Sequence, residues 1–123
     1  MTQKKSDLDL ITQTVQYYFD GMYHGDIELL KKAFHADAFL FGYLSGDYMH
    51  FSAKDWFNVV KERPAPSKEG EEYDMRIVST DVTEDAATVK VADLYMGLRF
   101  TDYLTLSKLD DKWVIINKAF HHD

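Results

Sequence analysis

The sequence contains no cysteine among its 123 residues. Disulfide bonds, thiolate nucleophiles and cysteine-ligated zinc sites are therefore excluded. Positive charge is also scarce, because 14 Lys and Arg residues stand against 21 Asp and Glu, and the formal net charge is −7. A chain without a basic cluster is a poor match for the nucleic-acid backbone or for an anionic membrane surface. We expect neither nucleic acid nor membrane among its partners.

Long apolar runs are missing as well. The longest run, Ala38 to Leu44, is far too short to cross a bilayer. The polar segment from Met1 to Leu10 lacks the apolar stretch of a secretory signal, so we expect a cytoplasmic protein. Glycine-rich phosphate loops and the Gly-x-Ser-x-Gly motif of serine hydrolases do not occur either, and we expect no cofactor.

Aromatic and apolar residues are plentiful. Hydrophobic residues make up 46% of the chain and aromatic residues 15%, with eight Tyr and eight Phe. A chain of this length and composition can bury one substantial core, so we expect a single domain over residues 1–123. The aromatic content favours an aromatic core or pocket lining.

Three helices are predicted in the first half of the chain. From Asp7 to Tyr23 the apolar residues recur at three- and four-residue steps, which is the spacing of one helical face. Gly25 suits the end of this helix, and Asp26 can cap a second helix that runs through Phe34. Ser52 can cap a third helix, which ends before two closely spaced prolines.

Strand patterns occupy the rest of the chain, separated from the third helix by a charged surface loop over residues 63–70. Short turns make most of these strands antiparallel neighbours. The sequence therefore predicts an α+β domain in which helices cover one face of a curved sheet, leaving a concave apolar pocket. The predicted strands are Ala38–Tyr43, Tyr48–Phe51, Glu72–Asp81, Ala86–Leu98, Phe100–Leu109 and Lys112–His121.

Asp102 interrupts an apolar face. Alternation along its strand places it with Phe100, Leu104 and Leu106. A carboxyl group there must be hydrogen-bonded, paired with a cation or held neutral by a raised pKa. It is either a satisfied structural aspartate or a perturbed acid in the pocket.

Two further residues could complement Asp102. Lys118 shares a face of the last strand with Ile116 and Phe120, but both faces of that strand are apolar, so the pattern leaves its direction open. If Lys118 points inward it can pair with Asp102 or hold an anionic ligand. Tyr18 lies on the apolar stripe of the first helix, where a buried phenol needs a hydrogen-bond partner.

The five histidines give no metal-ligand spacing, and we expect no metal site. His35 follows the second helix, where a histidine usually caps the helix or lies in a loop. In a pocket it could instead act as a general base near neutral pH.

The order of elements and several segments resemble the nuclear transport factor two-like superfamily over nearly the whole chain. The closest likeness is to the group named putative lumazine-binding proteins, neighbours of the SnoaL-like polyketide cyclases. The segments that carry the resemblance are Tyr17-Tyr18-Phe19, Gly25-Asp26, Phe34-His35-Ala36-Asp37-Ala38, Thr101-Asp102-Tyr103-Leu104 and Lys112-Trp113 to Phe120.

The resemblance implies a cystatin-like α+β fold, in which a strongly curved, mostly antiparallel sheet wraps on three N-terminal helices as a conical barrel. It also implies a homodimer formed through the sheet. Because this fold hosts enzymes, binding proteins and scaffolds, it leaves the function open.

Ketosteroid isomerases, which belong to the same superfamily, use a tyrosine and a protonated aspartic acid as an oxyanion hole. The resemblance places Tyr18 and Asp102 at these two positions. The position of the isomerase's base falls at Gly42, beside Tyr43, and neither residue is a carboxylate. Steroid isomerisation by that mechanism is therefore disfavoured, and a base would have to come from His35 or Lys118.

Three functions follow from this reading. The first is a small-molecule binding protein with an aromatic pocket anchored by Tyr18 and Asp102. The second is an isomerase, dehydratase or cyclase that stabilises an enolate with Tyr18 and Asp102 and a base such as His35. The third is a structural or partner-binding domain with a filled pocket. The expected ligand contacts are Tyr18, Phe34, Phe41, Tyr43, Trp56, Phe57, Asp102, Leu104, Lys118 and Phe120.

Overall fold

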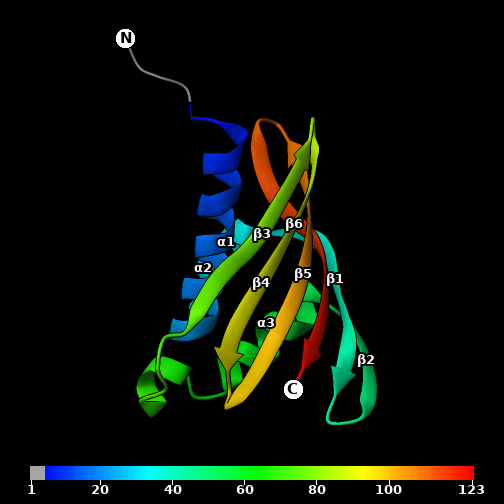
Figure 1. Ribbon diagram of the computed structural model, residues 1–123. Coiled ribbons are helices and arrows are strands. Elements are labelled where there is room, and N and C mark those ends of the chain that lie inside the picture. Colours follow the sequence, from blue (N-terminus) through cyan, green and yellow to red (C-terminus); the bar gives the residue numbers. More distant parts are fainter. Residues whose placement is uncertain (1–4) are drawn as a thin grey trace.

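The computed structural model describes residues 5–123, in which three α-helices and a short 3-10 helix pack against a six-stranded sheet (Figure 1). The helices are α1 (Asp7–His24), α2 (Ile27–Ala33), α3 (Ala53–Glu62) and the 3-10 helix η1 (Pro66–Glu69). The strands are β1 (Phe34–Leu44), β2 (Asp47–Ser52), β3 (Met75–Thr83), β4 (Ala86–Tyr95), β5 (Leu98–Leu109) and β6 (Lys112–His122).

α2 and α3 begin at the predicted caps, Asp26 and Ser52, and α1 begins at Ser6, a cap that was not predicted. The side chains of Ser6, Asp26 and Ser52 each accept hydrogen bonds from backbone N–H groups in the first turns of α1, α2 and α3. Gly25 ends α1 in the left-handed conformation with φ 63°. The second helix is shorter than predicted, because the chain becomes extended at Phe34 and continues directly as β1.

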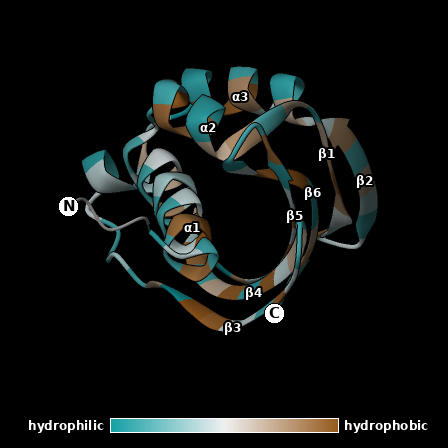
Figure 2. Cartoon of the chain, turned by 90° about the horizontal axis from the view of Figure 1, so that it is seen from above, coloured by the Kyte–Doolittle hydropathy of each residue, from teal (hydrophilic) through white to brown (hydrophobic). Residues whose placement is uncertain are grey.

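The sheet has the strand order β2-β1-β6-β5-β4-β3. The pair β1 and β6 is parallel, and all other neighbouring pairs are antiparallel. Figure 2 shows the sheet curving around α1, with α2 and α3 along the other side of the enclosed space. The expected strong curvature is present, but β2 and β3 remain as free edges and the sheet does not close into a barrel.

Several strand boundaries differ from the prediction, among them the start of β3, which is Met75 rather than Glu72. At β1 and β4 the reason is identifiable. β1 begins at Phe34 rather than Ala38, since Phe34 already pairs with Ile115 of β6. β4 ends at Tyr95, because Met96 and Gly97 adopt positive φ angles of 54° and 78°. These angles are typical of a tight hairpin turn.

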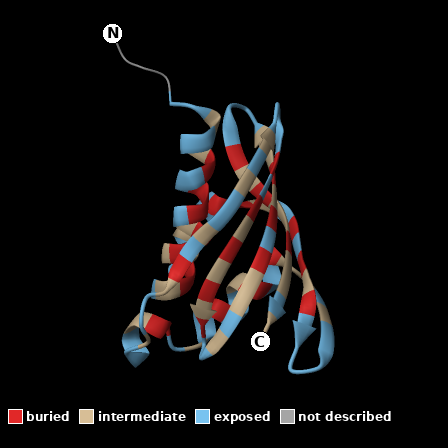
Figure 3. Ribbon diagram, in the orientation of Figure 1, coloured by how far each residue is buried: buried red, intermediate tan, exposed pale blue. Residues whose placement is uncertain are grey.

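The core lies between α1 and the concave face of the sheet. Figure 3 shows buried residues on the inner side of α1 and at alternating positions along β4 and β5. The residues with no exposed surface include Ile11, Val15, Tyr18, Met22, Leu30, Val89, Val91, Leu104, Leu106 and Ile115.

A β-bulge in β6 determines the direction of Lys118. Ile115 pairs with Leu106 and Asn117 pairs with Thr105, so Ile116 is an extra residue without a partner on β5. The bulge changes the phase of alternation, and both Ile115 and Lys118 face the interior. This explains why both faces of the predicted strand appear apolar.

Candidate functional site

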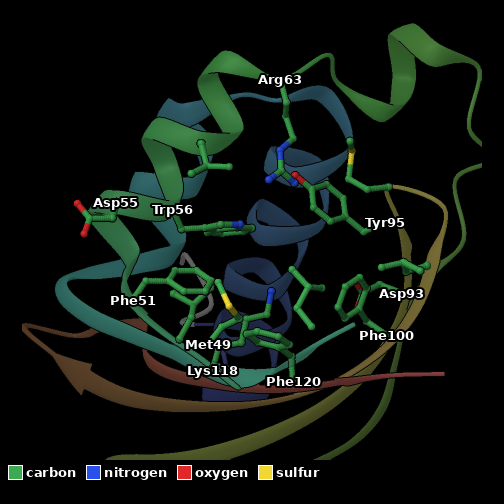
Figure 4. A pocket seen from close by; sticks show the side chains of 15 residues that line it. Met49, Phe51, Asp55, Trp56, Arg63, Asp93, Tyr95, Phe100, Lys118 and Phe120 are labelled. Atoms are coloured by element: carbon green, nitrogen blue, oxygen red, sulfur yellow. The ribbon is translucent and has the colours of Figure 1, made fainter. Parts of the chain in front are cut away.

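A cavity of about 400 Å³ lies between α3 and the concave face of the sheet (Figure 4). Its size falls within the range of small-molecule sites, and its surface is mostly aromatic and aliphatic. The lining residues are Leu40, Leu44, Met49, Phe51, Asp55, Trp56, Val59, Arg63, Asp93, Tyr95, Met96, Leu98, Phe100, Lys118 and Phe120.

Lys118 brings a positive charge into this apolar cavity, and only 6% of its surface is exposed. Its Nζ atom lies 4.7 Å from the centroid of the Trp56 ring and 5.0 Å from that of Tyr18. Cation–π contacts of this kind partly replace water around a buried ammonium group. Nζ also lies 3.9 Å from Oδ2 of Asp102, which provides the opposite charge.

Tyr18 and Asp102 form the pair that the sequence singles out. The Tyr18 hydroxyl donates a hydrogen bond of 2.6 Å to Oδ2 of Asp102, and both residues are fully buried. Burial, followed by the charge of Asp102, raises the pKa of Tyr18 well above its ordinary value. Neither residue belongs to the cavity lining. The two lie behind Lys118, and the phenol proton is directed to Asp102 rather than to the cavity.

Asp93 is a second buried carboxyl group, and the sequence analysis did not select it. It exposes 3% of its surface and lines the cavity. Asp93 pairs with Phe100 across β4 and β5, and Val91 pairs with Asp102, so the two aspartates are diagonal neighbours on one face. The alternation that identified Asp102 also applies to β4, where Asp93 shares a face with Val89 and Val91.

The surroundings of Asp93 favour its neutral form. Burial is the main cause that raises the pKa of Asp93 to about 9, and the charge and hydrogen bonding of Asp102 add to it. Within residues 5–123, Oδ1 of Asp93 and Oδ1 of Asp102 are both buried without a hydrogen-bond partner. A proton carried by Asp93 can be donated either to Asp102 or to an oxygen of a bound ligand. The cavity is therefore lined both by an acid whose neutral form is favoured and by the ammonium group of Lys118.

The other predicted ligand contacts fall into three groups. Trp56, Lys118 and Phe120 line the cavity. Phe34, Phe57 and Leu104 do not, because they pack in the helix-to-sheet contacts or under the cavity floor. The outward-facing residues of β1 lie on the opposite side of the sheet: Phe41 stacks on His50 with the ring centroids 4.5 Å apart, and Tyr43 is 59% exposed.

His35 lies outside the cavity lining. Its Nδ1 atom accepts a hydrogen bond of 2.9 Å from the backbone N–H of Asp37, so it has a local structural role at the start of β1. Among residues 5–123 no three His, Asp or Glu side chains cluster closely enough to hold a metal ion.

Solved structures with the same architecture are described as NTF2-like, the nuclear transport factor two-like class. One from Silicibacter pomeroyi, of unknown function, has a TM-score of 0.86 and 24% identity, covering 94% of this chain and 95% of that one. Another, from Methylobacillus flagellatus and also of unknown function, has a TM-score of 0.84 and 31% identity, covering 100% and 98%. The fold is therefore that of the nuclear transport factor two-like superfamily.

Residues 6–121 match the model of the family described as "Putative lumazine-binding", and the chain belongs to this family. A curated relative, Aldolase FrzH of a Cladobotryum species, is 29% identical over 119 residues, covering 94% of this chain and 91% of the relative. In residues 5–123 no helix has the length and apolar character needed to span a membrane.

Proposed function

We propose that this chain binds a small, planar or cyclic carbonyl compound in the cavity, with its oxygen toward Lys118 and Asp93. The observation that carries the proposal is that two buried polar residues, Lys118 and Asp93, line one mainly aromatic and aliphatic cavity. Both groups are donors that a carbonyl oxygen can accept from. Tyr18 and Asp102, the predicted anchors, do not line the cavity in this proposal. They stabilise Lys118 and Asp93, which do.

Several features favour binding over a structural role with a filled pocket. The cavity has space for a ligand of about the size of a bicyclic aromatic compound, and Trp56 and Phe120 offer faces on which a flat molecule can stack. Burying two carboxyl groups and an ammonium group is costly for a core that only has to be stable.

Nuclear magnetic resonance with butyrophenone, a simple aromatic ketone, tests the binding proposal. We expect backbone amide shifts to change around Leu40, Trp56, Lys118 and Phe120. Val59 lines the cavity with 45% of its surface exposed, so Val59→Trp should obstruct the cavity and weaken binding. Val78→Trp is the matched control, because Val78 is 49% exposed and lies outside the lining. Shift changes confined to the outer face of the sheet would contradict the proposal.

A second candidate is enzymatic chemistry through an enolate, as in an isomerase, dehydratase, cyclase or aldolase. The relative named as an aldolase favours it, as do two lining residues, Lys118 and Asp93, that can donate to a carbonyl oxygen. Hydrogen bonds from Lys118 and Asp93 would stabilise the negative charge that develops on that oxygen, and one such donor is typically worth about 2.7–4 kcal/mol in the transition state. The α-proton would pass to water or buffer, because His35 lies outside the cavity lining.

The exchange of the α-hydrogens of butyrophenone for deuterium tests this chemistry. An enolising protein should accelerate the exchange above that in buffer, and Lys118→Met should lower the rate by about two orders of magnitude. Binding without any acceleration would leave the chain as a binding protein.

We also propose that the protein forms a homodimer through the outer face of its sheet and is cytoplasmic. The outer face carries exposed aromatic side chains from β1, β2 and β5, among them Tyr43, Tyr48 and Tyr103. Exposed apolar patches of this kind favour association.

A further inference from the structure

Arg63 lies at the opposite side of the cavity from Lys118, directly after the end of α3. In Figure 4 its side chain extends into the cavity, and the guanidinium group lies beside the hydroxyl of Tyr95. The guanidinium carbon lies 5.9 Å from the centroid of the Tyr95 ring. Among the ion pairs formed within residues 5–123, none involves Arg63. The cavity therefore has an arginine whose charge is not matched by a carboxylate.

The Tyr95 hydroxyl is the second polar group at this end, and the neighbouring Arg63 guanidinium acts against the burial that raises the pKa of Tyr95. Tyr95 exposes 6% of its surface, and its hydroxyl is buried without a hydrogen-bond partner in the described part of the chain. Leaving such a group unpaired costs about 1–3 kcal/mol. A ligand oxygen between Tyr95 and Arg63 would accept from both.

The distribution of charge separates the two ends of the cavity. The charge of Lys118 is balanced by Asp102 at 3.9 Å, so this end suits a neutral carbonyl group. The charge of Arg63 is not balanced in this way. Asp55, the acidic lining residue on α3, points away from Arg63 in Figure 4. A negatively charged group on a ligand is therefore stabilised at the arginine end.

The spacing of the two ends follows from β4. Asp93 and Tyr95 are two positions apart on the same face of this strand. At about 3.3 Å per residue, their Cα atoms are separated by about 7 Å. A keto group and a carboxylate joined by a short methylene chain can span such a distance.

We propose that Arg63 and Tyr95 form a carboxylate-binding subsite, and that the ligand of this cavity is an aromatic keto acid. This inference rests on the proposed function, since it assumes that the carbonyl end lies at Lys118 and Asp93. Arginine suits the role because its planar guanidinium group can donate two parallel hydrogen bonds to a carboxylate.

Isothermal titration calorimetry with γ-benzoylbutyrate, its methyl ester and butyrophenone tests the subsite. The acid should bind the unmodified protein about tenfold more tightly than the ester, because a charge-assisted hydrogen bond contributes a binding free energy of that size. Arg63→Met should reduce the ratio of the two affinities to about one, and Tyr95→Phe should reduce it partly. Arg76→Met, which removes an exposed arginine of β3 outside the cavity lining, should leave the ratio unchanged.

The outcomes separate this inference from the proposal on which it rests. Equal affinities of acid and ester for the unmodified protein would overturn the carboxylate subsite and leave ketone binding intact. An acid preference that survives Arg63→Met would also overturn it, since the acid would then be held elsewhere, for instance by Lys118. If none of the three compounds binds, both the subsite and the proposed function fail.

Discussion

At the level of single residues, the charge of Lys118 depends on a small set of partners. Asp102 lies 3.9 Å away, and the rings of Trp56 and Tyr18 lie within 5.0 Å of Nζ. Breaking a buried ion pair by removing one partner typically costs about 3–5 kcal/mol, because the remaining charge is uncompensated. The hydrogen bond from Tyr18 then keeps Asp102 oriented toward Lys118.

Tyr18→Phe tests that hydrogen bond. The substitution removes the donor to Oδ2 of Asp102 and keeps the ring, so we expect the free energy of unfolding to fall by about 1–3 kcal/mol. Urea denaturation measures this change. Tyr103→Phe is the matched control, because Tyr103 is 47% exposed on the outer face, and its effect should stay within about 0.5 kcal/mol. Equal effects of the two substitutions would contradict a structural role for the Tyr18 hydroxyl.

Asp93 makes the stability depend on pH. Its pKa is raised from 3.8 to about 9, so the folded chain holds this proton more tightly than the unfolded chain. Its contribution is fully present below about pH 4 and is lost as the pH rises toward 9. Relative to the unmodified protein, Asp93→Asn should gain up to about 1.4 kcal/mol of stability per pH unit in that window.

Denaturant titrations at several pH values measure the effect. Asp81→Asn, at an exposed position of β3, serves as the control. Its free energy of unfolding should depend on pH in the same way as that of the unmodified protein. A difference between Asp93→Asn and the unmodified protein that stays constant from pH 5 to about pH 9 would show that Asp93 is ionised throughout.

At the level of elements, local patterns predicted the helices well, because caps and apolar spacing act over a few residues. They could not give the direction of Lys118, since the bulge at Ile116 reverses the alternation and depends on pairing with β5. The aromatic composition of β1 likewise did not show which of its side chains line the cavity. Its side chains divide between the two faces of the sheet, so Phe41 lies outside the cavity although its composition fits a pocket.

Gly42 shows how pairing between β1 and β6 shapes the cavity. A Cβ atom at this position would overlap the carbonyl oxygen and the ring of Phe120, which lines the cavity. The ring of Phe120 thus fills the space next to Gly42.

We expect Gly42→Ala to lower the free energy of unfolding by about 1–3 kcal/mol, as overpacking does. Thermal denaturation measures the loss. A variant as stable as the unmodified protein would mean that β1 and β6 can separate without cost at this point.

At the level of the whole molecule, the order of elements was sufficient to predict the α+β architecture and the superfamily. The site was harder to predict, because it is assembled from residues distant in the chain. Tyr18 and Asp102 are 84 residues apart and hydrogen-bonded to each other. The resemblance implied instead that both would donate to the oxygen of a ligand. Asp93, Tyr95 and Arg63 were missed, since only the curvature of the sheet and the placement of α3 bring them to one cavity.

The proposed homodimer is a property of the whole molecule and can be tested by its mass in solution. Sedimentation equilibrium should give twice the mass of the chain, and Tyr103→Glu should shift the protein toward the monomer by placing charge in the apolar outer face. Gln13→Glu, on the exposed side of α1, adds negative charge away from the sheet and should remain dimeric. A monomer at all concentrations would refute association through the sheet.

The most direct test of the central claim is a carbon-13 NMR titration of the aspartate carboxyl groups, assigned with Asp93→Asn and Asp102→Asn. We expect one carboxyl of this pair to remain protonated at neutral pH and to titrate near the pKa of about 9 given for Asp93. Its chemical shift should change when butyrophenone is added, because the ligand accepts from this acid. The account would be contradicted if both carboxyl groups were ionised at neutral pH and their chemical shifts did not change when the ketone was added.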